Sequence, residues 1–151
     1  MRHGWLKLEF QDDNDGTGKL IAAVEARGFA GRGGAWFGIA QIEEFADLIT
    51  AYPLPWNKKC SLAGGFWKER GHELDQEHLG IDVYPIDRRG RIGVQVRIAS
   101  ELWKGSRPES QMIAKVEVIT SYQVLADFSS QLRKLVHGSL EQALLEGDTL
   151  D

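Results

Sequence analysis

The chain has 151 residues, of which 42% are hydrophobic and 26% are charged, and its formal net charge is −4 at pH 7. This composition is ordinary for one globular domain, so we expect residues 1–151 to form a single domain. Because phosphate binding needs a concentrated positive surface, the negative charge argues against a nucleic-acid partner. A basic protein partner fits the two acidic ends of the chain better.

The sequence also bears on the compartment. No apolar run approaches the ~20 residues of a membrane span, and the N-terminal residues lack the apolar core of a secretory signal. Cys60 is the single cysteine, which excludes an internal disulfide and fits a reducing environment. We therefore expect a cytoplasmic protein without membrane association.

In the first third of the chain, apolar and polar residues alternate over residues 5–10 and 19–27, which predicts two strands joined by the acidic loop 12–18. A third strand is expected over residues 31–37. From residue 39 to residue 52 the apolar period changes to that of a helix, and Pro53 ends it.

Residues 59–66 follow as a short predicted strand, and the most polar stretch of the chain, within residues 68–78, reads as a loop. Alternation then predicts an antiparallel meander between Leu79 and Ile119. A second amphipathic helix is expected from Tyr122 to His137, with Ser121 as its N-cap. Residues 141–146 are either a short helix or an additional edge strand.

The register of the central hairpin follows from keeping its apolar rows on one face. Pairing Val83 with Val94 requires an even loop centred on Arg88 and Arg89, and it places Tyr84 opposite a glycine. The order of elements predicts an α+β fold: an antiparallel sheet of about six or seven strands in meander order, with two amphipathic helices packed on one face.

Two segments carry candidate metal ligands. The acidic loop at residues 12–16 does not align with a calcium-binding loop, so we interpret it as a solvated turn. His72 and His78 lie in the polar loop and are the candidate ligands there, but their spacing does not match the helical pair of His ligands in zinc proteases. We therefore predict no cofactor and interpret this loop as a polar surface connection.

Other reactive groups also have structural interpretations. Cys60 lacks a recognised nucleophile context and is expected to be a buried thiol. Each of the five tryptophans is interpreted first as a core residue, but three lie in polar surroundings typical of binding surfaces. The candidate partner-binding residues are Trp56, Trp67, Tyr84, Arg88, Arg89, Arg97 and Trp103.

The pattern of elements resembles the small bacterial immunity proteins of the WapI type. The resemblance depends on Gly28-Phe29-Ala30-Gly31 and Ala35-Trp36-Phe37, which lead into Ile42-Glu43-Glu44-Phe45-Ala46-Asp47-Leu48-Ile49, and on the later meander and the terminal helix. It implies a cytoplasmic, non-enzymatic protein that binds and neutralises a toxin domain. An acidic patch for a basic toxin would lie either at Asp12, Asp13 and Asp15 or at Glu43, Glu44 and Asp47.

The leading hypothesis is a non-enzymatic domain that binds another protein, which the resemblance identifies as a toxin. One alternative is an enzyme or a metal- or small-molecule-binding domain that uses the polar loop 68–78. A second alternative is a homo-oligomeric structural module. The residue pattern leaves open which sheet face or loop binds.

Overall fold

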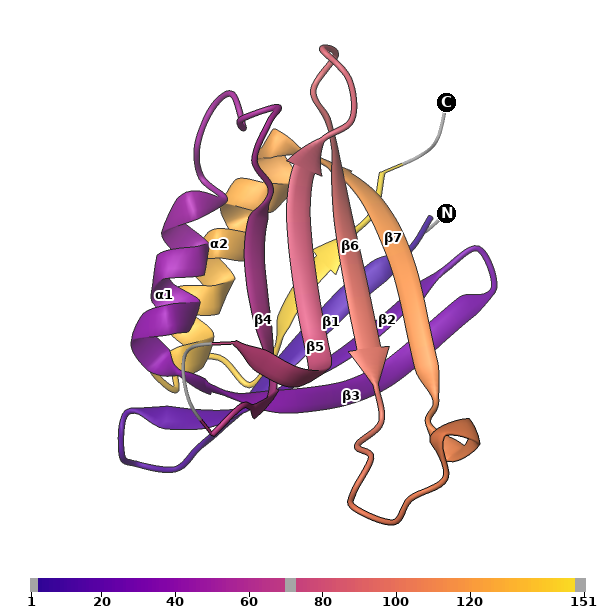
Figure 1. The fold of residues 1–151 in the computed structure, drawn as a ribbon. Helices are drawn as coiled ribbons and strands as arrows, with labels where there is room; N and C mark the ends of the chain where they lie inside the picture. Colours follow the sequence, from indigo (N-terminus) through magenta and orange to yellow (C-terminus); the bar gives the residue numbers. More distant parts are fainter. Residues whose placement is uncertain (1–2, 70–72, 149–151) are drawn as a thin grey trace.

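The computed structural model describes residues 3–69 and 73–148. In these ranges the chain forms two four-stranded antiparallel sheets, with strand orders β3-β2-β1-β8 and β4-β5-β6-β7, and two α-helices (Figure 1). The strands are β1 (Trp5–Asp12), β2 (Thr17–Ala26), β3 (Phe29–Gly38), β4 (Cys60–Trp67), β5 (Leu74–Pro85), β6 (Arg91–Ala99), β7 (Ile113–Ser121) and β8 (Ala143–Glu146). The helices are α1 (Ile39–Leu48), α2 (Tyr122–Val136) and the short 3-10 turn η1 (Pro108–Ser110).

The α+β class is confirmed, but the expectation of one continuous sheet is wrong. β4 pairs with β5 and not with β3, and α1 with the loop that follows it leads the chain from the first sheet to the second. Figure 1 shows β1, β2 and β3 running across β5, β6 and β7 rather than beside them. The chain thus builds two separate layers of strands.

The two helices lie side by side at one side of the molecule (Figure 1). Each helix contacts both sheets: α1 packs against β3 and β4, and α2 packs against β1, β7 and β8. The apolar face of the meander was expected to lie under the helices, yet β5, β6 and β7 also pack against β3. One apolar core therefore forms between the two sheets and the helices.

Glycines on β3 allow the two sheets to approach closely. A Cβ atom at Gly33 would lie 2.6 Å from Cγ2 of Ile98 on β6, and one at Gly31 would lie 2.6 Å from Cβ of Ala114 on β7. Any side chain at these positions would push the sheets apart. The glycines within residues 31–37 are thus what lets β3 cover the second sheet.

The central hairpin has the predicted register. Val83 pairs with Val94 and Tyr84 with Gly93. The amide of Ile86 donates to the carbonyl of Arg91 at 3.0 Å, which leaves an even loop over residues 87–90. Residues on the opposite face of β5–β7 are consequently the polar ones, as the register requires.

Both helices begin where the sequence predicts, at Ile39 and Tyr122, and α2 ends at Val136, one residue before the predicted end. Ser121 caps α2, where its hydroxyl accepts from the Val124 amide at 3.3 Å. α1 ends at Leu48 rather than at Tyr52. The reason is local, since the hydroxyl and the amide of Thr50 both donate to the Asp47 carbonyl, at 2.6 and 3.1 Å, and close the last turn.

Three further expectations are settled by the fold. Residues 143–146 form an edge strand that pairs with β1, as one of the two alternatives had it. The polar loop is shorter than predicted, because β5 begins at Leu74 and includes His78. The preference for core tryptophans is wrong: among all five, Trp5 is half-buried and the other four are exposed.

Candidate functional site

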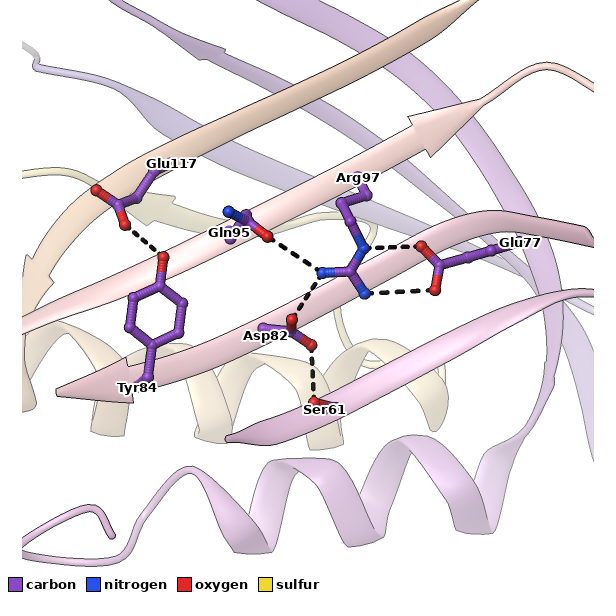
Figure 2. Close-up of polar contacts among 7 residues, drawn as sticks. All are labelled: Ser61, Glu77, Asp82, Tyr84, Gln95, Arg97 and Glu117. Carbon is purple, nitrogen blue, oxygen red and sulfur yellow. Dashed lines mark hydrogen bonds and ion pairs between the residues drawn. The ribbon is translucent and has the colours of Figure 1, made fainter. Parts of the chain in front are cut away.

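Arg97 is the centre of a charge network on the outer face of the second sheet (Figure 2). Its Nε and Nη2 atoms donate to the two oxygens of Glu77, at 2.8 and 3.3 Å, and its Nη1 donates to Asp82 at 2.7 Å. Ser61 donates to the other oxygen of Asp82 at 2.7 Å. Side chains alternate across a strand, so the register that buries the apolar rows places Asp82 and Arg97 on the outer face. Glu77 joins them because a β-bulge at His78 shifts the register of β5, so that Gly64 pairs with Leu79 but Gly65 pairs with Glu77.

The charged groups of this network pair with one another. The hydrogen bonds that Arg97 donates to Glu77 and Asp82 raise its pKa, so its guanidinium stays charged. A depression of about 340 Å³ lies beside it and is lined by Gln76, Lys115 and other residues, but the guanidinium already points at carboxylates. We therefore interpret Arg97, a predicted partner-binding residue, as an internal counter-ion.

Tyr84 belongs to the same face, where its hydroxyl donates to the carboxylate of Glu117 (Figure 2). Burial and the negative charge of Glu117 raise the pKa of this phenol. Its ring covers Gly93, and the Lys59 ammonium lies 4.9 Å from the ring centroid. A phenol that stays protonated and donates to a carboxylate is a poor general base.

The tip of the β5–β6 hairpin is held in one conformation by Asp87. One oxygen of this carboxylate accepts from the amides of Arg89 and Arg91, at 2.8 and 3.3 Å, and the other accepts from Nε of Arg91 at 2.6 Å. These bonds lower the pKa of Asp87 below its usual value, and the Arg91 side chain contributes most. Gly90 completes the loop with a φ of 93°.

Beside this tip lies a hollow of about 270 Å³, called here the Trp56 hollow. It lies between the loop after α1, the hairpin tip and the first residue of α2. Tyr52 contacts Tyr122 edge to face, with ring centroids 4.8 Å apart, and the hydroxyl of Tyr122 accepts from the Leu54 amide at 3.0 Å. The lining residues are Tyr52, Pro53, Trp56, Asp87, Arg88, Arg89, Gly90 and Tyr122.

The seven predicted partner-binding residues thus fall into three places. Tyr84 and Arg97 belong to the outer face, whereas Trp56, Arg88 and Arg89 meet at the hollow. The other two are at the opposite end of the second sheet. There Trp67 ends β4 beside Trp36, and Trp103 lies 4.8 Å from the ring of Phe66.

Sequence reasoning missed Tyr52 and Tyr122, because both were assigned to the apolar stripes of helices. Tyr52 is in fact 80% exposed and lies beyond the end of α1. The neighbouring Pro53 was a usable signal, since a helix cannot include the residue before a proline without strain.

The polar loop 68–78, which carries the candidate metal ligands, lies only partly within the described residues. His72 lies outside the described residues. His78 is buried, and its Nε2 atom lies 2.6 Å from the Gln76 side-chain oxygen, which also accepts from the Leu102 amide. In residues 3–69 and 73–148 there is no group of three His, Cys, Asp or Glu side chains that could hold a metal ion. His78 therefore acts as a structural donor there.

Cys60 is buried, and burial raises the pKa of its thiol. Its sulfur donates to the carbonyl of Leu48 at 3.6 Å. A thiol held in the protonated form has little nucleophilic character, so Cys60 packs as a small apolar residue.

Several acidic side chains of the two patches already have partners within the protein. Asp12 and Asp15 accept from the amides of Asn14 and Thr17, at 2.8 and 3.0 Å, so they serve the loop itself. On the helices, Asp47 pairs with Arg133, and a Glu43 oxygen lies 3.5 Å from His137.

Comparison of the chain with known protein families, curated proteins and solved structures gives no match. In the described part of the chain, neither helix has the length and apolar character needed to cross a membrane.

Proposed function

We propose that this protein is a non-enzymatic domain that binds another protein through the Trp56 hollow. The observation that carries the proposal is the exposed cluster of Trp56, Tyr52, Arg88 and Arg89 around a shallow depression. Trp, Tyr and Arg are the residues that most often dominate the binding energy of protein interfaces. Large aromatic side chains that are 58% and 80% exposed are also costly to leave in water.

The segments that carry these residues are held in place by hydrogen bonds, which supports this role. Asp87 fixes the hairpin tip through three hydrogen bonds, and the Tyr122 hydroxyl fixes the loop after α1 at Leu54. A surface that is ordered before binding loses less conformational entropy when it binds. This favours a preformed contact site over a loop that folds around its partner.

The chemistry of the other titratable groups favours binding over catalysis. Arg97 is engaged by two carboxylates, Tyr84 is engaged by Glu117, and Cys60 is buried with a raised pKa. Each group is therefore held in the state that makes it least reactive. The resemblance to WapI-type immunity proteins makes a toxin domain the first partner to test.

The test is capture of the partner from native cells by the tagged protein, with Trp56→Ala and Trp36→Ala as matched variants. Both tryptophans are similarly exposed, at 58% and 53%, but Trp36 lies at the other end of the molecule. We expect wild type and Trp36→Ala to retain one partner that Trp56→Ala loses. Mass spectrometry identifies that partner, and a toxin encoded beside this gene would support the immunity role.

Two outcomes would refute the proposal. One is that all three proteins retain the same set of partners, which would remove the Trp56 hollow from the interaction. The other is that the purified protein at high concentration sediments as a stable oligomer and that Trp56→Ala dissociates it. That result would favour the homo-oligomeric alternative.

A further inference from the structure

We infer that the Trp56 hollow binds an acidic peptide segment of the partner, with carboxylates on the hairpin tip and an apolar side chain between the aromatic rings. This inference rests on the proposed function and names the chemistry that the hollow recognises. An acidic segment differs from the basic partner that the net charge of the whole chain favours. The reason is that the charge around the hollow is positive, whereas the net charge of the chain is negative.

The first argument is the unbalanced charge of the hairpin tip. Arg88 and Arg89 are both exposed, and neither has a carboxylate within ion-pair distance among the described residues. The nearest acidic residue, Asp87, is already occupied by Arg91, whose Nε lies 2.6 Å from it. Two adjacent guanidinium groups are thus available, and guanidinium binds carboxylates through paired hydrogen bonds.

One neighbouring feature adds positive potential. α2 begins at Tyr122, in the wall of the hollow, so the positive end of the helix dipole lies there. Apart from Asp87, the lining of the hollow has no acidic residue.

The shape of the hollow selects a peptide over a small molecule. At about 270 Å³ it is smaller than the usual range of ~300–1,000 Å³ for ligand pockets, and it holds one side chain rather than a whole cofactor. Trp56, Tyr52 and Tyr122 give it aromatic walls, which bury an apolar side chain while the carboxylates beside it reach the arginines.

A peptide is also favoured over a nucleic acid. Phosphate polymers need a long positive surface, but the chain carries a net charge of −4. On the outer face of the second sheet, a nucleic acid would meet the carboxylate of Glu117. A short acidic segment of a protein needs only the two arginines and the aromatic walls.

The experiment is a titration of the full ¹⁵N-labelled protein, followed by NMR. The probe is a capped peptide of alternating Glu and Phe; its comparators are the same peptide with Gln or with Lys in place of Glu, and a single-stranded oligouridylate. We expect the Glu peptide to shift the Trp56 indole signal and the Arg88 and Arg89 amides in a saturable way. The Gln peptide should bind at least tenfold more weakly.

Matched variants locate the charge requirement. Arg88→Gln with Arg89→Gln should abolish the shift at Trp56, whereas Arg107→Gln should leave it unchanged, because Arg107 is exposed in the loop at the other end of the sheet. The NMR spectra of the free variants, if they match that of wild type away from the substituted residues, show that the fold is intact.

Three results would overturn the inference: equal binding of the Glu and Gln peptides, tighter binding of the Lys peptide, or tighter binding of the oligouridylate. Shifts mapped outside the Trp56 hollow would do the same. None of these results tests the proposed function. That function is decided by whether Trp56→Ala loses the cellular partner, which does not depend on the charge of the probe.

Discussion

Arg97 holds two carboxylates on a surface that water only partly reaches. Its own side chain is 29% exposed, and that of Asp82 is 11% exposed. A carboxylate with so little contact with water is costly unless a charged donor faces it. Without Arg97, Asp82 would keep the Ser61 hydroxyl alone, and Glu77 would lose both of its bonds to the guanidinium.

We predict that Arg97→Met lowers the free energy of unfolding by about 1.5–3 kcal/mol, the range for hydrogen bonds to charged groups. Arg107→Met is the control, because this arginine is exposed and its guanidinium makes no ion pair in the described chain. The control should change stability by less than about 0.5 kcal/mol. Urea denaturation measures both, and equal effects would contradict the counter-ion role.

The phenol of Tyr84 predicts how stability depends on alkaline pH. Burial, and then the bond to Glu117, raise its pKa above the ordinary value near 10, so the folded state favours the protonated form. This contribution is fully present below pH ~10 and is lost as the pH rises towards the folded-state pKa. Tyr84→Phe lacks the ionisable group. Above pH ~10, wild type should therefore lose stability faster than the variant in urea unfolding; parallel curves would exclude the effect.

At the scale of elements, the hairpin of β5 and β6 was predictable and the division into two sheets was not. Its register follows from matching apolar residues across one ladder, which is local information. Whether β4 pairs with β3 or with β5 depends instead on where the loop after α1 leads the chain. Both partners have apolar faces, so the pattern of residues does not distinguish them.

The packing of β3 on the second sheet predicts a coupling between Gly33 and Ile98. Gly33→Ala should destabilise the protein by about 1–3 kcal/mol, because the new Cβ would lie 2.6 Å from an Ile98 methyl group. Ile98→Ala removes that methyl. In the double variant the cost of Gly33→Ala should become much smaller, as a double-mutant cycle in urea measures. Additive effects would show that the two sheets do not touch there.

The candidate site shows the same division between local and long-range information. The sequence indicated Trp56 from its polar surroundings and Arg88 and Arg89 from the loop of the hairpin, each on local grounds. That these three lie around one hollow depends on the α1 loop, the tip and the start of α2 meeting in space. Tyr52 and Tyr122 were missed because helical spacing alone places a residue on a stripe, whether or not the helix continues that far.

At the scale of the whole molecule, both sheets and both helices contribute to one core. Leu8 on β1, Ile81 on β5, Phe45 on α1 and Phe128 on α2 are each at most 2% exposed and belong to the same cluster of buried side chains. A shared core makes the stability of each layer depend on the other.

This arrangement predicts that the chain unfolds as a single domain. Unfolding in urea followed by tryptophan fluorescence and by far-UV circular dichroism should give coincident transitions. Ile81→Val should shift both transitions equally, by about 0.5–1.5 kcal/mol. Separate transitions, with only one of them moved by the substitution, would show that the two sheets are independent units.

The side chain of Gln131 has a consequence for how the chain behaves among copies of itself. From α2, its amide donates to the Leu144 carbonyl at 3.1 Å and its oxygen accepts from the Leu144 amide at 2.8 Å, as a neighbouring strand would. An open strand edge is a template for aggregation. One glutamine therefore occupies the backbone groups of Leu144 with which a strand of a second molecule would pair.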